Sequence, residues 1–336
     1  TGFVQKEDND KSYDYYSYKA NYNSHLDKIS PNTRFNISSK FIAGLHNNKI
    51  SIEKSDNSKN NKITVDILSL YRTNNKYITN HNLITNKMNN RINVDLEHRY
   101  RYSYGKGIIN LRFESSAIGS DYDYNKLILE VNNNNTVKKL KIKTRTFLQL
   151  GTGSNWAEES KLYLSGANPE EMMNSKFTRS EGIITNEDML YSNNSYVFHS
   201  AGGLNLRGYS GHLFRSFERN DNGDKSPQNY GTSGASINTE IDFTSYLPHS
   251  IRKYNFNTYL FGDMGIISHK NITRENYNNA FSDILIDGGI GFTYTISKFG
   301  PLEKVNPLII RIDIPLYLNE LDQDKMKFIL GVNRAL

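Results

Sequence analysis

The stretch "RINVDLEHRYRY" (residues 91–102) decides the fold class. Apolar and aromatic side chains recur at every second position, at Ile92, Val94, Leu96, Tyr100 and Tyr102. Polar side chains stand between them, at Asn93, Asp95, Glu97, Arg99 and Arg101. Because side chains alternate across a strand, a period of two over this length predicts a β-strand with one apolar and one polar face.

The same alternation recurs along the chain. It is present in "TRFNISSKFI" (33–42), "KITVDILSLY" (62–71) and "GIINLRFES" (107–115), and later in "NFNTYLFGDMG" (255–265) and "PLIIRIDIPLYL" (307–318). "NNNNT" (132–136) is interpreted as a turn between two strands. We predict seven long strands before the stretch 151–232 and five after it, over about 235–334. Twelve antiparallel strands of about ten residues are typical of a transmembrane β-barrel. A short piece at 49–54 would raise the number to fourteen.

The composition agrees with a single all-β domain over residues 1–336. The chain holds 23 Tyr and 16 Phe, yet its mean hydropathy is −0.65. A barrel can be this hydrophilic because only alternate residues of each strand face lipid. A soluble β-sandwich is the structural alternative. The sequence opens on Thr1 without an initiator Met, so we expect a mature or excised product.

Several classes of protein are excluded or disfavoured. The chain has no Cys, which excludes disulfides and thiolate metal sites. It has no run of about 18 apolar residues, so no transmembrane helix is expected. A net charge of +6 is spread along the chain, and nucleic acid is not expected as a partner. We find no motif of a zinc peptidase or a serine hydrolase, and therefore predict no enzyme activity, no cofactor and no metal site.

A basic stripe is predicted inside the barrel. In "VKKLKIKTRTFLQL" (137–150), Leu140, Ile142, Leu148 and Leu150 share one face. Lys139, Lys141, Lys143 and Arg145 share the other. The stripe is either a barrel wall balanced by acidic strands nearby or an anion pathway.

One long interruption, about 151–232, is too long for a structureless loop unless it is functional. It contains "AGGLNLRGYSGH" (201–212), in which four glycines surround Arg207. An arginine buried in a lumen requires a carboxylate partner, because guanidinium does not lose its proton. The polar faces of the following strands offer Glu240 and Asp263, and a loop that folds back into the barrel would bring Arg207 to them. The alternative is a surface arginine in a mobile loop.

The C-terminal part resembles the barrel of the outer membrane protein 85 superfamily, the group of BamA, TamA and the two-partner secretion transporters. The resemblance rests on an ordered set over residues 198–336: "LRGY", "FGDMG", "DGGIGF", "SKFGPLEKVNP", "IRIDIPL" and "FILGV". The usual barrel of that group has sixteen strands and carries periplasmic repeat modules. This chain resembles a short barrel-only member.

The resemblance implies roles for individual residues. Leu206, Arg207, Gly208 and Tyr209 would form the tip of an extracellular loop folded into the lumen, with Asp263 and Glu240 as acceptors for Arg207. Gly331 would lie where the last strand bends. That bend would weaken a seam between about 326–333 and 12–22, which is the proposed lateral gate of the insertases.

The resemblance also implies a function. The chain would be a multi-pass barrel in the outer membrane of a Gram-negative bacterium that helps insert, assemble or translocate proteins or lipids. Its partners would be lipopolysaccharide or phospholipid, client polypeptides and accessory periplasmic proteins. Two alternatives stay open: a membrane anchor or export barrel for a fused peptidase or lipase domain, and a passive pore.

Overall fold

The fold is described from a computed structural model. It describes residues 4–6, 13–16, 18–26, 30–42, 44–73, 86–168, 170–171, 196–210, 218–219, 225–226, 230–248, 255–270, 279–296, 308–319 and 328–333.

The main element is an antiparallel sheet in which each strand pairs with the next along the chain. Its N-terminal strands are β3 (Tyr18–His25), β4 (Thr33–Ile42), β5 (Leu45–Ser55), β6 (Asn61–Arg72), β7 (Met88–Tyr102), β8 (Gly105–Ser116), β9 (Asp123–Val137) and β10 (Leu140–Asn155). The C-terminal strands are β16 (Gly234–Asp242), β17 (Phe256–Lys270), β19 (Leu285–Ile296), β20 (Leu308–Leu318) and β21 (Phe328–Asn333). The predicted all-β antiparallel architecture is confirmed.

The described residues form thirteen strands of this meander, where we predicted twelve. The five strands after the long interruption are present as predicted. The additional strand is β5, which contains the short piece at 49–54 and pairs along its length with β4 and β6. Its Ile50 and Ile52 are exposed by 44% and 48%, as alternate outward-facing positions of a strand are.

The asparagine run between β9 and β10 is a strand rather than the turn we predicted. Asn132–Asn135 pair with β8 on one side and with β10 on the other. The chain reverses only at Lys138, whose φ of 57° is left-handed. The prediction was wrong because two neighbouring strands satisfy the backbone of the asparagines, which overrides their turn preference.

The two faces of the sheet differ in character. On β6, Ile63, Val65 and Ile67 are exposed by 41%, 41% and 56%. The alternate positions Asp66 and Leu68 are buried, at 3% and 5%. The apolar side chains of the alternation therefore point outward, and polar residues mixed with a few leucines point inward.

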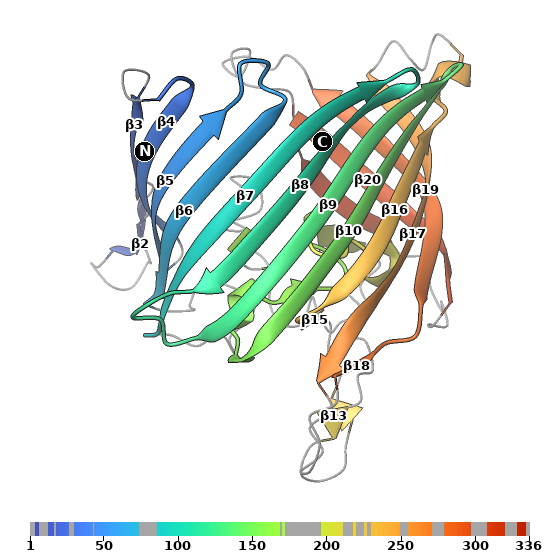
Figure 1. Cartoon of the computed structure of the whole chain (residues 1–336). Helices are drawn as coiled ribbons and strands as arrows, with labels where there is room; N and C mark the ends of the chain where they lie inside the picture. Colours follow the sequence, from blue (N-terminus) through green and yellow to red (C-terminus); the bar gives the residue numbers. More distant parts are fainter. Residues whose placement is uncertain are drawn as a thin grey trace.

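The sheet is strongly curved (Figure 1), and described parts of the chain between β10 and β16 pack against its inner face. We call residues 156–168, 170–171 and 199–210 the inner segment. It carries the 3₁₀ turns η1 (Glu158–Ser160) and η2 (Arg207–Tyr209) and the short strand β11 (Leu162–Tyr163), which pairs with β15 (Tyr230–Gly231). The buried apolar core lies where this segment meets the inner face of the sheet and consists of Phe147, Leu162, Leu164, Leu204, Leu206, Tyr209, Ile267, Leu285 and Leu318.

Among the described residues, the last and first strands do not pair, so the predicted seam is not formed there. Besides β20, β21 pairs in parallel with β12 (Tyr196–His199), so β12 lies where the first strand was expected. Within the described ranges, β3 pairs only with β4, and the sheet is open between β3 and β12. Residues 12, 17 and 326–327 of the predicted seam lie outside the described residues.

Shorter elements complete the description. They are β1 (Val4–Lys6), β2 (Tyr13–Tyr16), β13 (Glu218–Arg219), β14 (Lys225–Ser226), β18 (Asn279–Phe281) and the turn η3 (Thr244–Tyr246). In the described part of the chain, no helix has the length and apolar character needed to cross a membrane.

Candidate functional site

The tip of the inner segment is the motif at 206–209, and it is buried. Leu206 and Tyr209 are exposed by 0% and 1%, and the chain between them turns through η2. The phenol of Tyr209 donates a hydrogen bond of 2.7 Å to Oδ1 of Asn319, just beyond β20. Asn205, with a φ of 58°, lets the chain turn sharply before the motif. The burial of Leu206 and Tyr209 and the hydrogen bond of the Tyr209 phenol hold the short turn in one place on the sheet.

Arg207 lies against both carboxylates that the sequence offered. Its Nε and Nη2 donate to the two oxygens of Asp263 at 2.7 and 2.8 Å, and its backbone N–H adds a third bond of 3.2 Å. Its Nη1 donates to Glu240 at 2.8 Å. The guanidinium also lies 4.3 Å from the ring centre of Phe261. A bidentate pair supported by a cation–π contact fixes both the position and the plane of the guanidinium.

A second arginine belongs to the same cluster. Arg311 of β20 donates to Glu240 and to Asp313 at 2.6 Å each. Asp313 also lies 3.9 Å from Nη1 of Arg207. Burial by itself would lower the pKa of Arg207, but Asp263, Asp313 and Glu240 raise that pKa well above its ordinary value. The motif arginine therefore stays charged inside the sheet.

The inner segment is held near this cluster by further polar contacts. Asn238 of β16 donates to the backbone oxygens of Leu204 and Asn205 at 3.3 and 3.0 Å. Arg145 of β10 donates to the oxygen of Gly203 at 2.9 Å. The wall formed by β10 and β16–β20 thus binds the segment through side chains and backbone alike.

The four basic residues of the predicted stripe do not form one continuous row of free charges. Lys139 lies in the turn before β10 rather than on the strand, contrary to our prediction, because β9 continues to Val137. Arg145 pairs with Glu130 at 3.1 Å, and Lys143 lies 3.9 Å from Glu240. Lys141 is exposed and stands opposite Asp242 in the register of β10 and β16. Acidic neighbours on adjacent strands therefore accompany the stripe, as the barrel-wall interpretation requires.

Gly331 lies in the middle of β21, between Arg311 on β20 and His199 on β12. The register of β20 and β21 runs through it without a shift. The bend that the resemblance implied is therefore not marked by a bulge. His199, in turn, places its Nε2 2.9 Å from the backbone oxygen of Ser165, which ties β12 to the inner segment.

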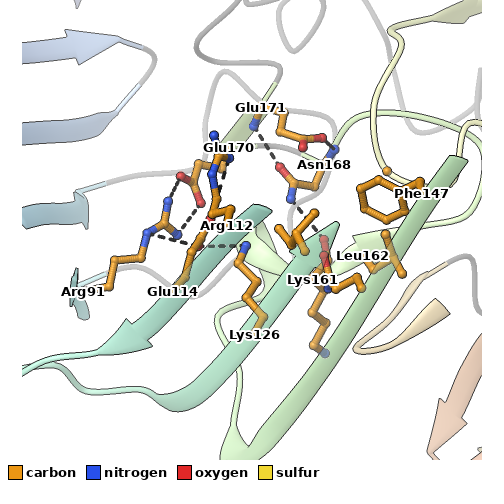
Figure 2. A pocket seen from close by; sticks show the side chains of 13 residues that line it. Arg91, Arg112, Glu114, Lys126, Phe147, Lys161, Leu162, Asn168, Glu170 and Glu171 are labelled. Carbon is orange, nitrogen blue, oxygen red and sulfur yellow. Dashed lines mark hydrogen bonds and ion pairs between the residues drawn. The ribbon is translucent and has the colours of Figure 1, made fainter. Parts of the chain in front are cut away.

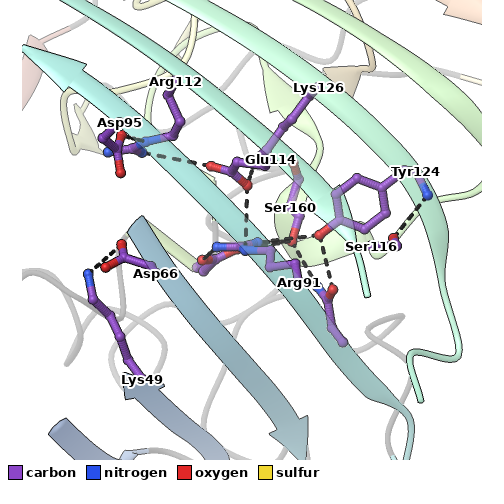
Figure 3. Close-up of polar contacts among 12 residues, drawn as sticks. Lys49, Asp66, Arg91, Asp95, Arg112, Glu114, Ser116, Tyr124, Lys126 and Ser160 are labelled. Carbon is purple, nitrogen blue, oxygen red and sulfur yellow. Dashed lines mark hydrogen bonds and ion pairs between the residues drawn. The ribbon is translucent and has the colours of Figure 1, made fainter. Parts of the chain in front are cut away.

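A second ionic cluster, which the sequence did not reveal, lies on the opposite wall and is centred on Arg91 of β7 (Figure 3). Arg91 holds Glu170 of the inner segment through both terminal nitrogens, with Nη1 2.8 Å from Oε2. Its Nε lies 3.5 Å from Glu114 of β8, and Lys126 of β9 pairs with the same carboxylate at 3.0 Å. Arg91, Glu114 and Lys126 are exposed by 4%, 2% and 5%. This cluster is as deeply buried as that of Arg207.

The 3₁₀ turn η1 is bound to the same wall. The hydroxyl of Ser160 lies 3.2 Å from nitrogens of both Asn89 and Arg91, and it donates to Glu170 at 3.0 Å. Arg72 of β6 pairs with Glu159 and reaches its Oε2 at 2.7 Å. Residues 156–168 and 170–171 are thus attached to β6–β9, and residues 203–209 to β10, β16 and β17.

A cavity of ≈ 90 Å³ lies beside the second cluster (Figure 2). Its lining includes Arg91, Glu114, Lys126, Glu170 and Asn168. Figure 2 shows these side chains pointing toward one another from the sheet and from the inner segment. Since the charged groups already pair among themselves, the cavity is part of an ion-pair network.

The sequence contained a signal for the part of this cluster that lies on the sheet. Glu114 and Lys126 are cross-strand partners of opposite charge, and both lie on the polar faces of adjacent predicted strands. Glu170 gave no signal, because its place depends on the path of a loop. No group of three or more His, Asp or Glu in the described ranges is arranged to hold a metal ion. Both clusters anchor the inner segment to the sheet through ion pairs.

Three solved structures are similar to this chain. BamA from Haemophilus ducreyi, lacking POTRA domains 1–3, aligns with a TM-score of 0.53 and 11% identity, over 93% of this chain and 60% of its own. OccAB4 from Acinetobacter baumannii aligns with a TM-score of 0.41 and 11% identity, over 95% and 64%. CdiB from Escherichia coli aligns with a TM-score of 0.44 and 12% identity, over 94% and 48%.

The chain therefore has the fold of an outer-membrane β-barrel, with the sheet open between β3 and β12. Within that class its fold is similar to BamA, as the resemblance to the outer membrane protein 85 superfamily implied. The chain spans 60% of the length of the BamA chain. No family model matches the sequence, and no curated protein matches it.

Proposed function

We propose that this chain is an integral barrel of the outer membrane of a Gram-negative bacterium that helps client polypeptides or lipids insert into, assemble in or cross that membrane. The observation that carries the proposal is the tip at 206–209. It is docked through Arg207 on Asp263 and Glu240 inside a BamA-like sheet.

The outer face of the sheet supports a membrane location. Ile63, Val65 and Ile67 of β6 stand opposite Leu96, Val94 and Ile92 of β7 in register. Ile92 and Leu96 are exposed by 44% and 43%, so the apolar side chains form a continuous outward patch across both strands. A large exposed apolar patch of this kind requires a lipid or protein partner. Hydrocarbon suits it, because each exposed side chain is aliphatic.

The inner segment supports a working barrel with an occupied interior over a passive pore. It is attached through Arg91 to one wall and through Arg207 to the other. Lys143 and Arg145, which the pore alternative needs as free lining charges, have acidic neighbours at 3.9 and 3.1 Å.

The test is an insertion assay in liposomes. The protein is reconstituted into vesicles, and a urea-denatured outer-membrane barrel is added as client. Folding of the client is followed by its resistance to heat and detergent on gels. We expect faster folding than in empty vesicles of the same composition. Equal rates in both would contradict the proposal.

Arg207→Ala and Arg112→Ala make a matched pair for the same assay. Arg207 is 1% exposed and anchors the tip, whereas Arg112 is 49% exposed and pairs only at the rim of the second cluster. Loss of insertion in the first variant and its retention in the second would link the activity to the anchor. Equal activity in both would dissociate the anchor from the function.

A further inference from the structure

The Arg207 cluster contains one carboxyl group that pairs with no cation of its own. Asp287 of β19 is 2% exposed and forms no ion pair among the described residues, and its carboxyl group faces the backbone N–H of Gly208 and the carboxyl group of Asp263. Its cross-strand neighbour is Asp263, whose two oxygens are taken up by Arg207. Two carboxyl groups thus stand side by side in a site that solvent does not reach.

The charges around Asp287 do not balance if every group is ionised. Two buried guanidiniums, those of Arg207 and Arg311, face four carboxyl groups, each from a different strand: Glu240 of β16, Asp263 of β17, Asp287 of β19 and Asp313 of β20. Lys143 of β10 adds a third cation at the rim, 3.9 Å from Glu240. One more positive charge is required for neutrality, since an unpaired buried carboxylate is strongly unfavourable.

The space around Asp287 decides what that charge is. Gly208 of the tip packs directly on it, so close that a Cβ on Gly208 would lie 2.7 Å from Cβ of Asp287. The oxygens of Asp287 are closed to solvent. A metal ion needs several oxygen ligands and room for them, and no metal-ligand group occurs in the described parts of the chain. Only a proton fits.

We propose that Asp287 is a proton-binding site: its carboxyl group is protonated and donates a hydrogen bond to Asp263, and this proton keeps the Arg207 tip docked. With the proton in place, three carboxylates face three cations. Once the proton leaves, the charged carboxylate requires water, and water reaches it only if Gly208 and the rest of η2 lift off the sheet. The inference deepens the proposed function, because it assigns a control to the same anchor.

The first experiment detects the proton directly. Infrared spectra of the detergent-solubilised protein are recorded for the wild type, Asp287→Asn and Asp66→Asn. Asp66 is a matched control, because it is 3% exposed but pairs with Lys49 at 2.7 Å. We expect the C=O stretching band of a protonated carboxyl group to be lost in Asp287→Asn and retained in Asp66→Asn. A band that survives in Asp287→Asn overturns the proposal.

The second experiment measures the pH dependence of unfolding by urea. An aspartic acid is ionised in the unfolded chain at neutral pH, so the folded state binds the extra proton. Stability then falls as the pH rises, by up to about tenfold in the unfolding equilibrium constant per pH unit. Asp287→Asn cannot lose a proton and is expected to remove this dependence. A wild-type slope in that variant overturns the proposal.

Neither measurement involves a client, so a failed insertion assay leaves the proton site standing. If Asp287→Asn does not fold, infrared spectra of the wild-type protein alone test the proton site. Its carboxyl band is then expected to disappear on alkaline titration, and a spectrum without such a band at neutral pH rejects the site.

Discussion

At the scale of single residues, two buried arginines define this protein. Arg207 and Arg91 each bind a carboxylate through two nitrogens, and both are nearly closed to solvent. They join sheet and inner segment from opposite ends: Arg207 reaches from the segment to the sheet, and Arg91 from the sheet to the segment. In each case, removal of the arginine takes a bidentate cation away from a buried carboxylate.

Arg91→Ala is therefore expected to destabilise the protein by about 3–5 kcal/mol, because the buried Glu114 and Glu170 lose the cation that they share. Arg112→Ala is the control, since that side chain is 49% exposed and its pairs contribute at most about 1 kcal/mol. Urea unfolding in detergent micelles measures both. Similar losses in the two variants would argue against a special role of Arg91.

Two glycines of the site allow an equally direct comparison. A Cβ on Gly208 would lie 2.7 Å from Cβ of Asp287, whereas on Gly331 the nearest atoms are at 3.5 Å. We expect Gly208→Ala to cost about 1–3 kcal/mol through overpacking and to displace the tip. Gly331→Ala is expected to be tolerated. The urea midpoints of the two variants test this, and a stable Gly208→Ala protein would show that the tip can shift without cost.

At the scale of elements, the pairing of β12 with β21 sets this sheet apart from the closed barrel that the sequence predicted. The last strand receives a parallel neighbour from within the chain, with Phe198 opposite Leu330 and His199 opposite Gly331. A strand edge that would otherwise be open to other chains is thereby covered.

A disulfide tests this pairing, and the absence of native cysteines makes the experiment simple. Phe198→Cys with Leu330→Cys joins cross-strand partners and is expected to oxidise readily, because partners on neighbouring strands lie within disulfide distance. Phe198→Cys with Val332→Cys lies out of register and is expected to oxidise poorly. Gel mobility with and without reductant reads out both, and equal yields would refute the register.

At the scale of the whole molecule, the inner segment connects the two walls of the curved sheet. Glu159 and Glu170 bind β6 and β7, while Arg207 binds β16 and β17. The segment should therefore leave the interior only when both attachments fail.

Conductance in planar bilayers measures the consequence. We expect low conductance for the wild type, a small rise for Arg91→Ala or Arg207→Ala alone, and a large rise for the double variant. A steady high conductance of the wild-type protein would support the passive pore and contradict an anchored inner segment.

The sequence alone determined the kind of strand and the direction of each face. A period of two assigns Ile92 and Asn93 to opposite faces whatever the partner strands are, so the all-β architecture and the inward placement of Glu240 and Asp263 could be predicted. Arg207 could be matched to them because a buried guanidinium requires a carboxylate. The predicted number of strands was one lower than the observed number. The strand missing from the prediction was β5, because its alternation is short.

The tertiary structure decided everything that depends on the path of the chain. Glu170 reaches Arg91 across 79 residues, β12 takes the edge of β21, and Asn132–Asn135 form a strand because two neighbours pair with them. No local pattern encodes these contacts, since their free energy comes from groups brought together only after the sheet has formed. The local periodicity thus determined to which face each side chain points, and the folded sheet determined which residues it contacts on that face.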